Sequence, residues 1–136
     1  MTLHLEIITP ERIAYSEEVD MVVAPSVMGT IGILPRHVPL FAQMVEGELK
    51  IKKGKDEIFL AIGGGFIEVT KTKVSVLVTR AVHAKELNEA EILKARSSAQ
   101  EALKTKPTGK YLAAAQALLR QSLVDMRLLR RRKSVH

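Results

Sequence analysis

The histidines are the first side chains to consider for metal or acid–base chemistry, because imidazole binds transition metals and titrates near neutral pH. They are widely separated, and no pair has a His-Glu-x-x-His or similar metal spacing. The four are His4, His37, His83 and His136. Cysteine is absent, which excludes both a disulfide framework and thiolate metal ligands. The sequence therefore predicts no metal site and no cofactor.

Motifs for nucleophilic catalysis and phosphate binding are also missing. There is neither a Gly-x-Ser-x-Gly elbow nor a Gly-x4-Gly-Lys-Ser/Thr loop. The run Gly63-Gly64-Gly65 leads into Phe66-Ile67-Glu68-Val69, which has the composition of a strand. A phosphate cradle requires a helix N-terminus at that point, so a bulge or a close backbone approach is favoured instead. A catalytic pair among the carboxylates is unsupported, and we expect no catalytic residues.

Positive charge is concentrated in the last third of the chain. Residues 1–84 carry nine Lys or Arg against ten Asp or Glu, a net charge of −1, whereas residues 85–136 carry twelve against five, a net charge of +7. On a helix, Arg120, Arg127 and Arg131 would share one line beside an apolar stripe. Such a segment suits nucleic acid, an anionic membrane or an acidic protein surface. A solvated helix flank is the plain alternative.

Strand periodicity dominates up to about residue 84. Leu3, Leu5 and Ile7 alternate with His4 and Glu6, and Val74, Val76 and Val78 alternate with Ser75 and Leu77. Gly- and Pro-containing turn signals recur about every ten residues and leave no room for crossover helices. Residues 1–84 are therefore predicted to form an all-β sandwich of about ten strands.

Helical periodicity replaces strand periodicity over residues 85–136. Asn88 is predicted to cap a helix whose apolar face consists of Ile92, Ala95, Ala99 and Ala102. Residues 105–109 contain Pro and Gly and should break it. A second helix is predicted over about 110–132, with the stripe Leu112, Ala115, Leu119, Leu123, Met126 and Leu129. The two should form an antiparallel α-helical hairpin, which needs a further surface for stability.

Composition indicates a soluble intracellular protein. No apolar run approaches the roughly 20 residues of a membrane span. Residues 1–8 lack the layout of a signal peptide. Five aromatic residues leave little for stacking on bases, which argues against nucleic acid as partner.

One stretch is more specific. Residues 29–40 read Gly-Thr-Ile-Gly-Ile-Leu-Pro-Arg-His-Val-Pro-Leu, and the chain opens with Ile7-Ile8-Thr9-Pro10-Glu11-Arg12. Gly64-Gly65-Phe66 is followed by Glu68-Val69. In these three motifs, the chain resembles the epsilon subunit of the rotary F-type ATP synthase. The resemblance covers both the β region and the helical region.

The resemblance implies a central-stalk subunit of the bacterial type, at the cytoplasmic face of the cell membrane. It would bind the gamma subunit and the c-ring, and couple ring rotation to catalysis elsewhere. Its helices could extend and inhibit ATP hydrolysis by docking on acidic loops of the alpha and beta subunits. The matching contact positions are His37 and Leu40 for gamma, Met28, Thr30 and Ile31 for the c-ring, and Arg120, Arg127, Arg130 and Arg131 for inhibition. His37 is equally compatible with a structural hydrogen-bonded histidine.

Some members of that family bind ATP on the hairpin through Ile/Leu-Asp-x-x-Arg-Ala. Here Ile92 and Arg96 match, whereas Leu93 and Ser97 replace the aspartate and the alanine. The lost carboxylate predicts weak or absent ATP binding. The alternative to the rotor function is a stand-alone module whose basic hairpin docks on nucleic acid or an anionic membrane. The sequence leaves open whether the hairpin rests folded or extended.

Overall fold

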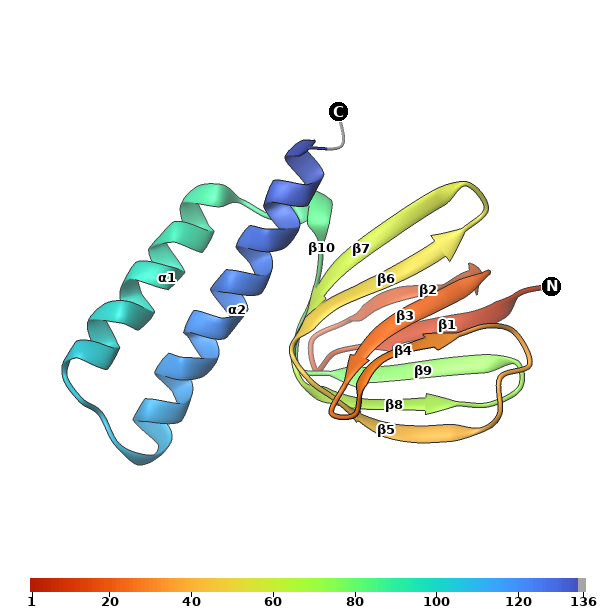
Figure 1. Cartoon of the computed structure of the whole chain (residues 1–136), viewed down its shortest axis with the longest axis horizontal. Helices are drawn as coiled ribbons and strands as arrows, with labels where there is room; N and C mark the ends of the chain where they lie inside the picture. Colours follow the sequence, from red (N-terminus) through yellow and green to blue (C-terminus); the bar gives the residue numbers. More distant parts are fainter. Residues whose placement is uncertain (135–136) are drawn as a thin grey trace. The chain divides into compact units, whose positions relative to one another are not determined.

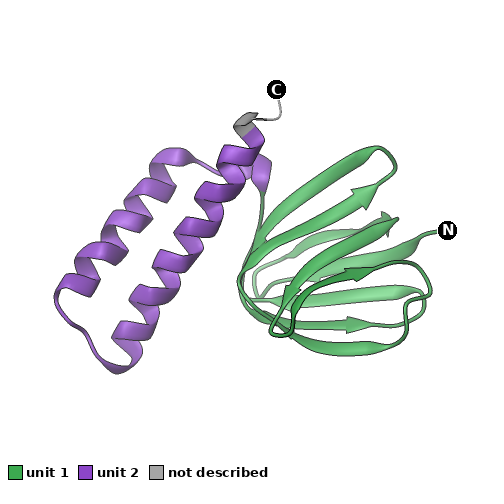
Figure 2. Cartoon of the chain, viewed as in Figure 1, with its two compact units in different colours: residues 1–83 green, residues 84–136 purple. Residues whose placement is uncertain are grey.

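The computed structural model describes residues 1–134. The chain divides into two compact units, residues 1–83 and the residues from Ala84 onward (Figure 2). The first unit contains the strands and the second contains the helices. Each unit is described below by itself.

The first unit is a ten-stranded β-sandwich, as predicted (Figure 1). The strands are β1 (Leu3–Ile8), β2 (Ile13–Val19), β3 (Met21–Ser26), β4 (Gly29–Ile33), β5 (Leu40–Met44), β6 (Gly47–Lys53), β7 (Asp56–Ile62), β8 (Gly65–Val69), β9 (Lys73–Val78) and β10 (Ala81–His83). Their order is β10-β7-β6-β3-β5-β8-β9-β1-β2, with β4 paired to β3. β1 and β9 pair in parallel, so the first strand is held in place by one of the last.

The core consists of the alternate side chains that the sequence pattern picks out. Leu3, Leu5 and Ile7 are buried, and the polar residues between them are half-buried. Val74, Val76 and Val78 are likewise buried on β9, where they alternate with half-buried Ser75 and exposed Leu77. Two-residue alternation turns one set of β-branched and leucine side chains inward on each strand. The outward set therefore decides what this unit presents to partners.

The second unit is an antiparallel helical hairpin of α1 (Glu89–Lys104) and α2 (Gly109–Ser134), preceded by the 3-10 turn η1 (Ala84–Glu86) (Figure 1). Asn88 is the N-cap of α1, and its side chain accepts a hydrogen bond from the Glu91 amide at 3.1 Å. α1 ends where Lys106 takes a positive φ of 52°. α2 begins one residue earlier than predicted and continues to Ser134.

Two residues of the predicted helix stripes are exposed. Leu123 is 45 % exposed, whereas Ser122 and Asp125 are buried. Successive steps of four residues advance about 40° around a helix, so Leu123 has rotated roughly 80° away from Ala115. Ser122 tolerates burial because its hydroxyl donates to the Leu119 carbonyl at 2.8 Å. On α1, Ala102 is exposed because it lines an open pocket at the hairpin connection.

Candidate functional site

An apolar row crosses the outer face of strands β5, β8, β9, β1 and β2. The row consists of the exposed residues Phe41, Phe66, Leu77 and Ile13 and of half-buried Ile8. Phe66 lies opposite Leu77, Leu77 opposite Ile8, and Ile8 opposite Ile13 in the strand register. The Phe41 and Phe66 rings are stacked, with centroids 5.5 Å apart and planes at 18°. Contiguous exposed apolar side chains of this kind mark protein-interaction sites.

Strand geometry explains why these side chains point outward. Ile67, Val76 and Val78 are buried in the core, and their sequence neighbours must face the opposite side of the sheet. Phe66 is 46 % exposed and Leu77 is 50 % exposed. The apolar row is therefore surface that the fold of this unit leaves uncovered.

A polar rim lies beside the apolar row on the same strands. Nδ1 of His4 donates to the Glu18 carboxylate at 2.7 Å, and the Thr2 hydroxyl donates to the same group at 3.0 Å. These hydrogen bonds lower the pKa of Glu18. An apolar centre with a charged rim is the usual composition of a protein interface.

The turn between β3 and β4 and the first residues of β4 carry two of the three residues predicted to contact a c-ring. Met28 is 80 % exposed at the tip, and Thr30 is exposed beside it. Buried Ser26 organises the turn, since its hydroxyl donates to the Gly29 carbonyl at 2.6 Å and accepts from the Met28 amide at 3.2 Å. Gly29 has a φ of 110°, which favours glycine. Ile31, the third predicted residue, packs partly against the core.

The loop between β4 and β5 carries the residues predicted to contact gamma. The Arg36 amide donates to the Lys71 carbonyl at 3.1 Å, which ties this loop to the β8–β9 turn. Nδ1 of His37 donates to the Val38 carbonyl at 2.7 Å, which fixes the ring orientation. Leu40 is half-buried against the core and immediately precedes Phe41 of the apolar row. Both readings of His37 stay open, because its ring is hydrogen-bonded and half-buried.

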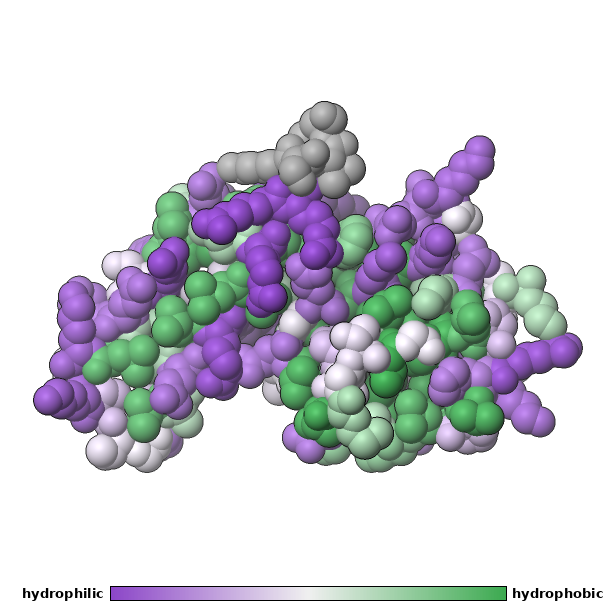
Figure 3. All heavy atoms as spheres, in the orientation of Figure 1, coloured by the Kyte–Doolittle hydropathy of each residue, from purple (hydrophilic) through white to green (hydrophobic). Residues whose placement is uncertain are grey.

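The four predicted docking arginines are exposed on α2. Leu123 lies among them at helical spacing, so this face combines cations with one apolar side chain. The arginines are Arg120, Arg127, Arg130 and Arg131. Figure 3 shows hydrophilic side chains gathered toward the C-terminal end of α2. The face has the charge and apolar content that suit an acidic, partly apolar groove.

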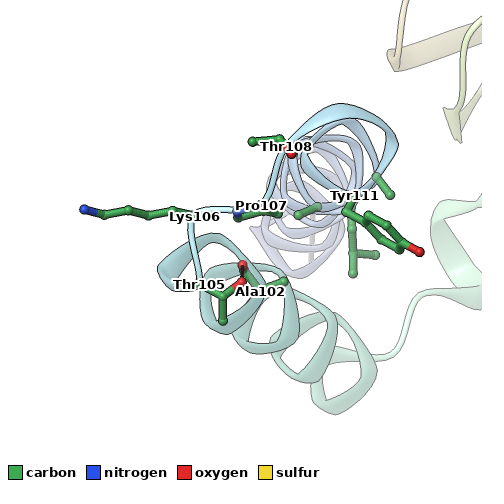
Figure 4. A pocket seen from close by; sticks show the side chains of 9 residues that line it. Ala102, Thr105, Lys106, Pro107, Thr108 and Tyr111 are labelled. Atoms are coloured by element: carbon green, nitrogen blue, oxygen red, sulfur yellow. Dashed lines mark hydrogen bonds between the residues drawn. The ribbon is translucent and has the colours of Figure 1, made fainter.

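The two residues of the degraded nucleotide motif lie in the first half of α1. Ile92 is buried and Arg96 is half-buried. An open pocket of about 630 Å³ lies at the opposite end of the hairpin, between the helices at their connection (Figure 4). It is lined by Ala102, Thr105, Lys106, Pro107, Thr108, Tyr111, Ala114, Ala115 and Leu118. Neither Ile92 nor Arg96 is among these lining residues, so this pocket does not gather the predicted nucleotide residues.

Metal chemistry has no support in the described residues. Across residues 1–134, no three His, Cys, Asp or Glu side chains come together in a way that could hold a metal ion. His136 lies outside the described residues. In that same part of the chain, no helix is both long and apolar enough to cross a membrane.

Sequence reasoning missed the apolar row. Phe41 and Phe66 occupy the polar phase of their strands, out of step with buried Ile67 and Val69. The signal that could have revealed the row is an aromatic residue at a strand position where the alternation predicts a polar, solvent-facing side chain. The row itself depends on strand register, because Leu77 and Ile8 become neighbours only through the parallel pairing of β9 with β1.

Comparison with known proteins agrees with this architecture. Residues 2–84 match the family model described as ATP synthase, Delta/Epsilon chain, beta-sandwich domain. The ATP synthase epsilon chain of Herpetosiphon aurantiacus is 41% identical over 98% of this chain and 98% of its own length. That of Dehalococcoides mccartyi is 40% identical over 96% of this chain and 94% of its own length.

Solved structures have the same fold at lower sequence identity. A chain of the Euglena gracilis mitochondrial ATP synthase, in a structure of OSCP, F1 and c-ring, aligns with a TM-score of 0.68 and 19% identity, over 99% of this chain and 82% of that chain. A chain from the central stalk and c-ring of the Tetrahymena thermophila mitochondrial ATP synthase aligns with a TM-score of 0.62 and 14% identity, over 95% and 97%. The family match and the identity of 40–41% to bacterial relatives over nearly the whole chain, together with the sandwich and the hairpin, show that this chain belongs to the ATP synthase epsilon chain family.

Proposed function

We propose that this chain is a non-catalytic subunit of the central stalk of a bacterial ATP synthase, held peripherally at the cytoplasmic face of the membrane by the complex. It couples c-ring rotation to the catalytic head through gamma. Its second helix inhibits ATP hydrolysis when the hairpin extends. No cofactor is required for these roles, since binding surfaces and not reacting groups carry them.

The apolar row is the observation that carries the proposal. Its exposed aromatic and aliphatic side chains need a partner to remove them from water. Gamma is the partner proposed for this face, with Leu40 and His37 at its edge and the polar rim around it. The exposed β3–β4 turn, with Met28 and Thr30, is proposed to face the c-ring.

The inhibitory role is supported by the exposed arginines of α2. One exposed ion pair contributes only about 0.2–1 kcal/mol. Several arginines that meet acidic loops of alpha and beta together can bias a two-state hairpin whose free-energy gap is a few kcal/mol. The net charge of +7 over residues 85–136 supports an acidic target for this segment.

The test compares ATP hydrolysis by a catalytic head reconstituted with full-length chain, with a chain ending at Ala84, and with a full chain in which Arg120, Arg127, Arg130 and Arg131 are changed to Gln. A matched control changes four exposed lysines of the same unit to Gln: Lys94, Lys104, Lys106 and Lys110. Equal binding with faster hydrolysis for the truncated and arginine variants, but not for the lysine control, is expected.

Equal hydrolysis rates for all forms would remove the inhibitory role and leave the helices with a packing role. Absence of binding to gamma by every form would contradict the stalk assignment. Liposome flotation and salt-dependent DNA binding would then decide between an anionic membrane and nucleic acid as the target of the basic hairpin.

A further inference from the structure

Arg132 differs from the other arginines of the basic helix in its contacts. It lies in the last turn of α2 and is half-buried, whereas Arg130 and Arg131 beside it are exposed. Its Nη1 donates to the Ala84 carbonyl at 2.6 Å and to the Leu87 carbonyl at 3.2 Å. Both acceptors belong to the short segment that precedes α1.

The two acceptor carbonyls form one compact turn. The Leu87 amide donates to the Ala84 carbonyl at 3.2 Å, which closes the 3-10 turn η1. The Leu87 side chain is 8 % exposed, and η1 contacts α2, so this turn is anchored in the helical unit. The Arg132 guanidinium therefore joins the C-terminal end of α2 to the residues at which this unit begins.

We infer that Arg132 is a latch that holds the hairpin closed, and that the hairpin cannot open until this guanidinium leaves the Ala84 and Leu87 carbonyls. The Arg132 latch is defined by these three residues. Opening would cost two charge-assisted hydrogen bonds, which are stronger than neutral ones. Opening would also free one more cation for an acidic partner. Arg132 therefore favours the closed hairpin while it binds the two carbonyls, and favours docking of the open hairpin once it has left them.

Arginine suits this position better than lysine. Its guanidinium presents five donors in a planar fork and stays charged across the accessible pH range, whereas an ammonium is a compact, strongly hydrated charge. A cation in the last turn of α2 also interacts favourably with the helix dipole. The consequence for inhibition rests on the proposed function, but the latch itself is a property of the free chain.

Hydrogen exchange of the free full-length protein tests the latch. Arg132→Gln should speed exchange of the protected amides of α1 and α2 by about tenfold or more, on the usual strength of hydrogen bonds to a charged group. Arg132→Lys, which keeps the charge but loses the fork, should lie between Arg132→Gln and the natural protein. Amides of the β-sandwich serve as an internal reference and should exchange at unchanged rates.

Arg130→Gln is the matched control. It removes the same charge from the same helical turn at an exposed side chain, so helix protection should stay as in the natural protein. Equal exchange in Arg132→Gln and Arg130→Gln would overturn the latch. Faster exchange in Arg132→Gln than in Arg130→Gln would establish the latch whatever the rate of hydrolysis by a reconstituted head, because the truncated and four-arginine variants test the inhibitory part of the proposed function separately. Faster exchange with stronger inhibition would support both.

Discussion

Ile8 lies opposite Leu77 across the parallel ladder between β1 and β9, although strands β2 to β8 separate them in sequence. This pairing completes the apolar row on the outer face of the sheet. It also makes docking of the row depend on correct assembly of the first strand with one of the last. Each variant of the row is therefore tested for binding and for stability, so that loss of a surface contact can be distinguished from loss of the fold.

Phe66→Glu should weaken binding to gamma by about thirtyfold or more, because it places a charge in the centre of an apolar contact. The folded chain should lose only about 1 kcal/mol, which is the usual worth of an aromatic pair such as Phe41 and Phe66. Binding is measured by titration with gamma and stability by urea unfolding. Leu93→Glu is the control, since Leu93 is also 46 % exposed but lies on α1. Equal weakening by both variants would argue against the apolar row as the docking face.

Gly65→Ala should destabilise the β-sandwich by about 3 kcal/mol, at the upper end of overpacking effects. A Cβ on Gly65 would meet the Leu77 carbonyl oxygen and lie 2.8 Å from the Val78 Cα, both of them backbone atoms that cannot move aside. Gly64→Ala is the matched control, because its Cβ would lie 3.6 Å from the Met44 carbonyl, an ordinary contact. A fall in Tm confined to Gly65→Ala is expected in thermal unfolding. A similar fall for both would mean that general glycine effects dominate.

The glycine run shows what sequence alone could establish. The sequence predicts a bulge or a close backbone approach at Gly63-Gly64-Gly65, and the crowding at Gly65 confirms the close approach. The alternating cores of β1 and β9, the Asn88 cap and the break between the helices were also readable, because each depends on residues near one another in sequence.

Contacts between residues that are distant in sequence could not be predicted from local sequence patterns. The motif at residues 7–12 contains both a local and a distant contact. The local one is the hydrogen bond that the Thr9 hydroxyl accepts from the Arg12 amide at 3.2 Å. Nη2 of Arg12 then donates to the Ala81 carbonyl at 2.9 Å, a contact that no local pattern contains. The apolar row and the Arg132 latch belong to the same class. Leu123 was placed on the wrong side of α2 because a stripe of four-residue steps drifts around a helix.

The natural chain should bind ATP weakly or not at all, because Leu93 stands where a carboxylate would complete the nucleotide motif. The double variant Leu93→Asp with Ser97→Ala restores the motif around Ile92 and Arg96, and should gain measurable affinity in calorimetry. Leu93→Asn with Ser97→Ala is the control, as it restores polarity without the charge. Tight binding by the natural chain would contradict the prediction and would allow ATP to stabilise the folded hairpin by mass action.

Stability at high pH should reveal the environment of Tyr15. Burial raises the pKa of Tyr15 from 10.0 to about 12, and the charge of Glu17 adds to the effect. Because the pKa is higher in the folded chain, the stabilising contribution is complete below pH 10.0 and is lost as the pH rises through about 12. Urea unfolding across this range should give a falling free energy of unfolding. Tyr15→Phe removes the titrating hydroxyl and should flatten the slope. An unchanged slope would show that the tyrosinate is tolerated in the folded state and that other groups govern alkaline unfolding.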